Sequence, residues 1–127
     1  LENAVLFRGR GEKLLRDHVI DGTISAVHVY FPDPWWKARH RKRRVMNEPF
    51  VKRVVDVLKP DGALHFWTDV REYFDVTTRL LTREIDLGGP HEVCETTPNH
   101  DFDYRTHFER RVRRNGKPVY RVVYYKR

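Results

Sequence analysis

The stretch Val29-Tyr30-Phe31-Pro32-Asp33-Pro34-Trp35-Trp36-Lys37 joins a strand to an acidic, aromatic turn. Residues 25–31 are β-branched, aromatic and almost continuously apolar, which is typical of a strand in a parallel sheet covered on both faces. Pro32 ends the strand because a proline removes a ladder donor, and Pro34 biases Asp33 away from helix. We therefore predict a carboxylate whose direction the backbone fixes. The alternative is a rigid loop whose aspartate only hydrogen-bonds its own turn.

A dense run of positive charge follows this turn. Six of the eight residues 37–44 are Lys or Arg, and nine more lie in residues 105–127, which contain one acid, Glu109. The formal net charge is +7 and the isoelectric point is about 9.8. Two basic segments with interleaved aromatic residues favour a partner with a phosphate backbone, although most charged runs are solvated surface. An anionic membrane is a weaker alternative, since no basic amphipathic helix stands out.

The composition limits the other possibilities. A chain of 127 residues forms one domain at most. The single cysteine, Cys94, excludes an intrachain disulfide and a cysteine-based zinc site, and it fits a reducing cytoplasm. No apolar run approaches the roughly 20 residues of a membrane span, and no signal peptide opens the chain, so we expect a cytoplasmic protein without a membrane partner. Because Leu1 is not an initiator methionine, we expect a piece of a longer chain.

Local patterns predict alternating strands and helices. Asn47 is a good N-cap, and Phe50, Val54, Val57 and Leu58 follow it at helical spacing, as a core-facing stripe. The expected strands are 4–7, 25–31, 63–68, 91–96 and 119–125, and the expected helices are 12–19, 48–58, 70–85 and 104–114. Residues 59–62 read as a turn. Residues 8–11 contain Gly-x-Gly, but the third glycine of a nucleotide loop is absent, so we favour a plain turn.

The two strongest strands, 25–31 and 63–68, are joined by a helix, which predicts a parallel pair with a right-handed crossover. Asp33 and Asp69 each lie just after one of these strands. In a parallel sheet both would then lie at the same edge, where open α/β sheets bind ligands. The alternative is two unrelated turn aspartates.

A fixed carboxylate beside aromatic rings suits a planar, nitrogen-bearing substrate such as a nucleobase, and the neighbouring guanidinium groups suit phosphates. No nucleophilic triad has a recognisable spacing. Asp101 and Asp103 near His100 could hold a metal ion, but an ordinary polar loop is favoured and we predict no metal site.

These motifs together resemble the bacterial tRNA (guanine-N7-)-methyltransferases, the TrmB family. The matching segments are Phe-Pro-Asp-Pro-Trp-Trp-Lys at 31–37 with the basic residues 39–44, Leu-Lys-Pro-Asp-Gly at 58–62 with Thr-Asp at 68–69, and Thr-His-Phe-Glu-Arg-Arg at 106–111. Their order and spacing agree across nearly the whole chain. The first segment is also similar to the shorter Pro-Pro-aromatic turn of other amino-methyltransferases.

The resemblance implies an α/β fold: a Rossmann-like class I methyltransferase sheet with helices on both faces and an antiparallel last strand. Residues 1–127 would form part of such a domain, with the N-terminal strands and the glycine-rich donor loop missing. It implies methyl transfer from S-adenosylmethionine to guanine N7 in the tRNA variable loop. It assigns Asp33 as the catalytic acid, which also contacts the cofactor. The substrate contacts that it implies are Lys37, Asp69, Thr106, His107, Phe108 and Glu109, and the RNA contacts are Arg39, His40, Arg41, Lys42, Arg43 and Arg44.

Two alternatives remain at this stage. The chain could be a non-catalytic RNA-binding module that kept the basic segment, or an N-methyltransferase that acts on DNA or protein through the same turn. The family usually has an acidic or amide residue near the adenine where this chain has Arg8-Gly9-Arg10-Gly11, so no donor contact is assigned to Arg10.

Overall fold

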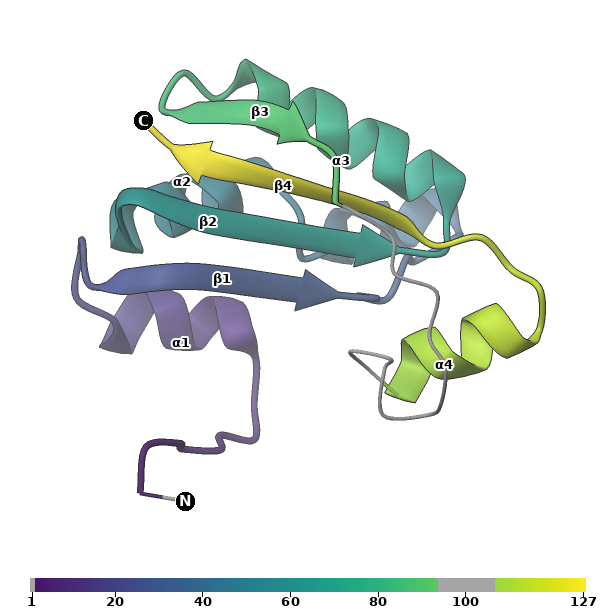
Figure 1. The fold of residues 1–127 in the computed structure, drawn as a ribbon, viewed down its shortest axis with the longest axis horizontal. Coiled ribbons are helices and arrows are strands. Elements are labelled where there is room, and N and C mark those ends of the chain that lie inside the picture. Colours follow the sequence, from purple (N-terminus) through teal and green to yellow (C-terminus); the bar gives the residue numbers. More distant parts are fainter. Residues whose placement is uncertain (1, 94–106) are drawn as a thin grey trace.

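Four strands form one mixed sheet in the order β1-β2-β4-β3 (Figure 1). The computed structural model describes residues 2–93 and 107–127. Its elements in chain order are α1 (Gly11–His18), β1 (Ile24–Tyr30), the 3-10 helix η1 (Ala38–Arg43), α2 (Glu48–Val57), β2 (Leu58–Thr68), α3 (Arg71–Arg83), β3 (Leu87–His91), α4 (His107–Arg114) and β4 (Tyr120–Lys126).

The parallel pairing of the first two strands is confirmed. β1 runs parallel to β2 with Tyr30 opposite Trp67, and the Phe31 N–H donates to the Trp67 carbonyl at 2.8 Å. The last strand, β4, is antiparallel to both β2 and β3, as expected. The carboxyl ends of β1 and β2 therefore lie at one edge of the sheet, and the segments that follow them begin side by side.

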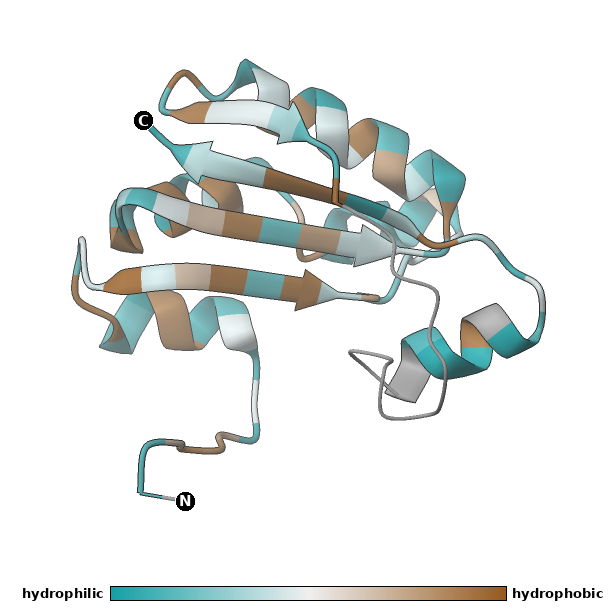
Figure 2. Cartoon of the chain, in the orientation of Figure 1, coloured by the Kyte–Doolittle hydropathy of each residue, from teal (hydrophilic) through white to brown (hydrophobic). Residues whose placement is uncertain are grey.

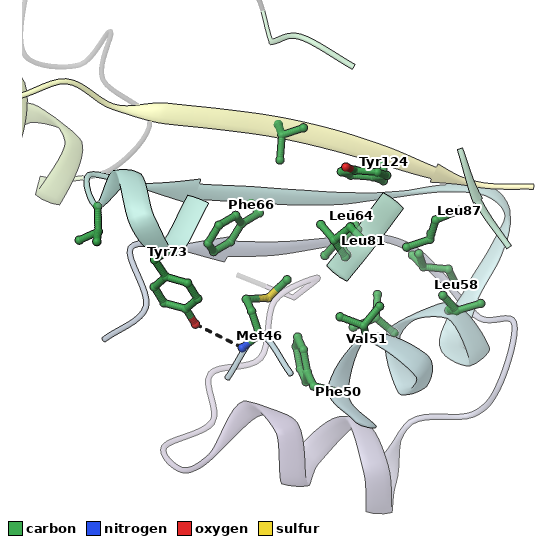
Figure 3. Close-up of a cluster of buried hydrophobic side chains, with 14 residues drawn as sticks. Met46, Phe50, Val51, Leu58, Leu64, Phe66, Tyr73, Leu81, Leu87 and Tyr124 are labelled. Carbon is green, nitrogen blue, oxygen red and sulfur yellow. Dashed lines mark hydrogen bonds between the residues drawn. The ribbon is translucent and has the colours of Figure 1, made fainter. Parts of the chain in front are cut away.

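The main core lies between the sheet and helices α2 and α3 (Figure 3). The Asn47 side chain caps α2 by accepting from the Phe50 N–H at 3.0 Å, as the sequence predicts. The predicted stripe of α2 is buried against the inner face of β2, whose Leu64 and Phe66 are fully buried. Each such side chain contributes about 1.5–3 kcal/mol of burial free energy.

The edge strand β1 is less covered than its sequence suggests. None of its residues is fully buried, because β1 has a strand neighbour on one side only. Helix α1 lies beside this edge and contacts α2, with Leu15 packed against the core (Figure 1). The predicted α/β architecture is confirmed, and among the described helices α2 and α3 pack together on one face of the sheet.

The predicted strand at residues 4–7 is wrong. The segment is coil, and Val5, Leu6 and Phe7 are exposed. Figure 2 shows an apolar stretch near the N-terminus that lies away from the sheet. Apolar β-formers become a strand only where a neighbouring strand supplies hydrogen bonds, and residues 2–10 pair with none of the described strands. The turn at residues 8–11 therefore does not link a strand to α1.

Two strand boundaries also differ from expectation. β2 begins at Leu58, so residues 59–62 form an irregularity within the strand rather than a turn before it, with Asp61 at φ 64°. β3 covers residues 87–91. The sequence predicts the strand at residues 91–96 instead, after a break at residues 86–90 that ends the preceding helix. A Gly-Gly-Pro sequence is tolerated because β3 is the other edge of the sheet. Residues 94–103, which hold the rest of that strand prediction and the loop after it, lie outside the described residues.

Candidate functional site

The turn after β1 holds Asp33 in a fixed direction. Two residues of this turn, Phe31 at φ 50° and Trp35 at φ 45°, adopt the left-handed conformation that side chains other than glycine rarely take. The Asp33 carboxylate accepts from the Trp35 N–H at 2.9 Å. Backbone strain of this kind concentrates at functional sites, but the hydrogen bond alone is what an ordinary rigid turn would also make.

A cavity beside the turn distinguishes a site from an ordinary turn. It has a volume of about 560 Å³, within the range of small-ligand sites. Asp33 and Trp35 line it together with three cationic side chains, an acid and two apolar side chains: Arg10, Lys42, Arg43, Glu12, Pro32 and Val45. A carboxylate, an indole ring and several cations therefore face one space, which suits a base attached to phosphates.

Residues 37–43, which we call the rim, present positive charge at the mouth of this cavity. The segment folds as η1, which begins with the His40 N–H donating to the Lys37 carbonyl at 2.8 Å. All of its Lys and Arg side chains are exposed, and His40 is half-buried. The Arg43 guanidinium lies 5.3 Å from the centre of the Trp35 ring, a cation–π contact. The expected RNA contacts Arg39 to Arg43 thus form one accessible surface.

Arg44 is a correction to that expectation. Only 6% of Arg44 is exposed, so it cannot serve as a surface contact for RNA. Its guanidinium donates to the Pro34 carbonyl at 2.5 Å and to the Glu72 carboxylate at 2.7 Å, and it lies 4.5 Å from the centre of the Tyr73 ring. We call this group of four residues the latch, because it ties the Asp33 turn to α3.

The latch shifts the pKa values of two of its members. The hydrogen bond from Arg44 lowers the pKa of Glu72 below its usual value, and the charge of Arg41, 3.6 Å away, acts in the same direction. Burial raises the pKa of Tyr73, so its phenol is protonated at neutral pH. The Tyr73 oxygen accepts from the Met46 N–H at 3.3 Å (Figure 3). Glu72 is therefore an anion and Tyr73 a neutral phenol around Arg44.

Asp69 follows β2 at the same edge of the sheet as Asp33, as the parallel pairing predicts. It is half-buried, and the preceding Thr68 accepts from the Val70 N–H at 3.1 Å to begin the turn into α3. Among the described residues, Asp69 does not line the cavity that contains Asp33. The structure therefore brings the two carboxylates to one edge but not into one described pocket.

The C-terminal part of the predicted site is described only in part. Thr106 lies outside the described residues, and His107 and Phe108 begin α4. Glu109 is 5% exposed. Figure 1 shows α4 on the side toward which β1 and β2 run. The substrate role of these four residues stays a prediction.

The sequence analysis missed Arg10 and Glu12 as residues of the cavity. Arg10 donates to Glu12 at 2.7 Å at the start of α1. Their position at a helix N-terminus, next to a glycine-containing turn, was a usable signal. Arg53 was not among the residues predicted to shape the site; its guanidinium donates to the carbonyls of Leu15 and Val19 at 2.8 and 2.5 Å and so ties α1 to α2.

Comparison with known proteins identifies the family. A family model described as "Putative methyltransferase" matches residues 1–122. The chain belongs to this methyltransferase family. The mixed α/β sheet, with its strand-end aspartates and ligand-sized cavity, is consistent with a methyltransferase of the Rossmann-like type.

Several curated relatives carry the name tRNA (guanine-N(7)-)-methyltransferase. One from Rhodopirellula baltica is 51% identical over 108 residues, which are 84% of this chain and 40% of the relative. One from Ralstonia pickettii is 41% identical over 91% of this chain and 44% of the relative. One from Neisseria gonorrhoeae is 32% identical over 98% of this chain and 51% of the relative. The chain thus spans about half the length of these methyltransferases, or less.

Two searches of the structure concern other kinds of site. No helix within residues 2–93 and 107–127 is long and apolar enough to cross a membrane. In the same described part of the chain, no three His, Cys, Asp or Glu side chains gather where they could hold a metal ion.

Proposed function

We propose that this chain forms the catalytic and RNA-binding part of a cytoplasmic tRNA (guanine-N7-)-methyltransferase, which moves a methyl group from S-adenosylmethionine to N7 of a guanine in the tRNA variable loop. The observation that supports it most is the cavity in which Asp33 and Trp35 face three cationic side chains. The names of the relatives support the same activity.

Guanine N7 carries a lone pair and no proton, so no general base is needed before attack. S-adenosylmethionine, when bound, supplies an electrophilic methyl group that leaves its sulfonium sulfur as the bond to N7 forms. The protein must align N7 with that methyl group and stabilise the positive charge that grows on the purine. A carboxylate with a fixed direction is suited to both tasks.

The residues present fit such a donor. The Asp33 carboxylate suits the cationic centres of S-adenosylmethionine, and the cavity volume is sufficient for part of the donor. Asp33 would contact both the donor and the guanine, because it lines the cavity directly after the end of β1. We therefore infer that Asp33 is the catalytic residue and acts as orienter and counter-charge.

The other predicted residues take supporting roles in this proposal. Lys37 and Asp69 would contact the substrate from the ends of η1 and β2, and Arg39 to Arg43 would hold RNA phosphates. The segment from Thr106 to Glu109 would contact the substrate near the methyl donor.

The test compares the intact natural protein with its Asp33→Asn variant. An asparagine oxygen can still accept from the Trp35 N–H, so the turn is retained while the charge is removed. We expect kcat on unmodified tRNA to fall about 100-fold or more, with tRNA affinity within about twofold of the wild type. The product is located by borohydride and aniline cleavage at N7-methylguanine.

The opposite result, weaker binding with unchanged turnover at saturating tRNA, would argue against this role for Asp33. Methyl transfer to duplex DNA but not to tRNA would favour the DNA-directed alternative. Binding of tRNA without methyl transfer by the intact wild type would favour the non-catalytic RNA-binding module.

A further inference from the structure

A second cavity adjoins the one that contains Asp33. It has a volume of about 520 Å³ and lies between α1, η1 and the start of α2. Its lining residues are Glu12, Arg16, Lys42, Asn47, Pro49, Phe50 and Arg53. Because Glu12 and Lys42 line both cavities, the two are neighbours, and together they form one groove that leads from Asp33 to α1.

We propose that this groove binds a nucleotide that flanks the methylated guanine, with its phosphate on Arg16 and Lys42 and its base over the apolar floor. The proposal rests on the proposed function, because it requires an RNA substrate at Asp33. It extends the RNA-binding surface from the rim onto α1, a helix that the sequence analysis did not connect with RNA.

Two cations of the groove, Arg16 and Lys42, are accessible. Lys42 is exposed, and the side chain of Arg16 is 64% exposed. Arg16 forms an ion pair with Asp17 at 2.9 Å, and an exposed pair of this kind contributes little to stability. The guanidinium can therefore turn to a phosphate at small cost, and each such contact releases counterions.

Arg53 has a different role from Arg16, although both line the cavity. Its guanidinium is held by the carbonyls of Leu15 and Val19 and by the carboxylate of Asp21. It therefore fixes the wall between α1 and α2. Because Arg53 is committed to these contacts, Arg16 is a better probe of ligand binding than Arg53.

The floor of the cavity is apolar. Pro49 is exposed in the first turn of α2, and Phe50 behind it closes the cavity toward the core. An apolar floor with cations at its edges is the arrangement by which proteins hold single-stranded nucleotides, because the base can lie on the floor while the phosphate meets the cations.

Replacing Glu12 tests the proposal through an expected gain in RNA binding. Glu12 is the acid that lines both cavities, and it accepts from the Arg10 Nε–H at 2.7 Å. A strand of RNA in the groove must pass this carboxylate, which repels phosphate. Replacing it with glutamine removes the charge and leaves Arg10 for the RNA.

The experiment measures tRNA affinity of the intact protein by fluorescence anisotropy over a series of salt concentrations, without methyl donor. We expect Arg16→Gln to weaken binding and to lower the slope of log affinity against log salt by about 0.7–0.9. We expect Glu12→Gln to tighten binding severalfold. The control is Arg83→Gln, an exposed arginine at the end of α3, which packs beside β3 at the edge of the sheet opposite β1; this variant should bind as the wild type does.

Wild-type binding by both Arg16→Gln and Glu12→Gln would overturn the proposal, as would an equal loss in Arg83→Gln. A misfolded variant cannot mimic the gain expected for Glu12→Gln. If the wild type makes no N7-methylguanine but the two variants respond as expected, the methylation proposal fails, and the groove binds RNA without any link to a methylated guanine. If methylation occurs and the variants bind as the wild type does, the groove fails alone.

Discussion

The rim and the latch are adjacent regions with similar side chains and opposite surroundings. Arg43 is exposed and lies over the face of Trp35, whereas Arg44 is buried and donates to the Pro34 carbonyl and the Glu72 carboxylate. An exposed guanidinium is solvated by water and salt ions, which a phosphate can displace, so it remains available for binding. A buried one must be paired, so it is committed to the fold. The difference separates the residue that shapes the Asp33 turn from those that can contact RNA.

The sharpest test of this comparison is Arg44→Ala. Removing the guanidinium leaves the Glu72 carboxylate and the Pro34 carbonyl without their donor, and we expect the free energy of unfolding to fall by about 2–3 kcal/mol. This is below the value for a fully buried pair because the Glu72 side chain is 37% exposed. Urea unfolding measures it. Arg43→Ala is the matched control and should change stability by less than about 0.5 kcal/mol. Equal losses in the two variants would remove the distinction between rim and latch.

The rim should show the reverse pattern in RNA binding. In the double variant Arg39→Gln with Arg43→Gln, two phosphate contacts are lost. Between 50 and 200 mM salt, wild-type tRNA affinity should therefore fall about tenfold more than that of the variant. The unfolding free energy of the double variant should equal that of the wild type. Filter binding at several salt concentrations measures the slopes, and parallel slopes would show that these arginines do not meet phosphates.

Asn47 connects the latch residue Arg44 to the start of α2. Its amide nitrogen donates to the Arg44 carbonyl at 3.0 Å, and its amide oxygen accepts from the Phe50 N–H. We expect Asn47→Ala to lower the unfolding free energy by about 1 kcal/mol. Asn47→Asp keeps the acceptor for Phe50 but loses the donor to Arg44, so its stability should lie between the alanine variant and the wild type. Chemical denaturation of the three proteins at pH 7 tests this order.

The smallest effect concerns the pH dependence of the latch. Because Arg44 lowers the pKa of Glu72 in the folded state, the carboxylate stabilises the fold at pH values above its unfolded pKa of about 4.5. That stabilisation is lost as the pH falls through the lower folded value. The stability difference between the wild type and Glu72→Gln should therefore be a few tenths of a kcal/mol or more at pH 7 and should shrink below about pH 4.5. A difference that grows in acid would contradict the direction of the shift.

Several features of the site were predictable from local patterns. Pro32 and Pro34 around Asp33 indicated a fixed turn, and the apolar runs on either side of one helix indicated parallel strands. Parallel strands place Asp33 and Asp69 at one edge whatever the rest of the fold does. The Asn47 cap was readable because a cap depends on residues three positions apart.

The predictions that failed concern residues whose surroundings are set by partners far away in the sequence. Arg44 looks like its neighbours in the sequence, and its burial follows from Glu72 and Tyr73, nearly thirty residues later. Arg53 fits a solvent-facing position of α2, but the carbonyls of Leu15 and Val19 hold it inward. The apolar residues 4–7 had strand composition but no neighbouring strand to bond.

The sequence by itself determined β1, β2 and the helix between them, the acidic turn at the end of β1 and the surplus of positive charge, because these are set by the chain within a few residues. Only the tertiary structure decided which cations are available and which are committed, and that Arg10, Glu12 and Arg16 border the groove beside Asp33. The physical reason is that burial and electrostatic pairing are set by neighbours in space, which come from separate elements of the chain.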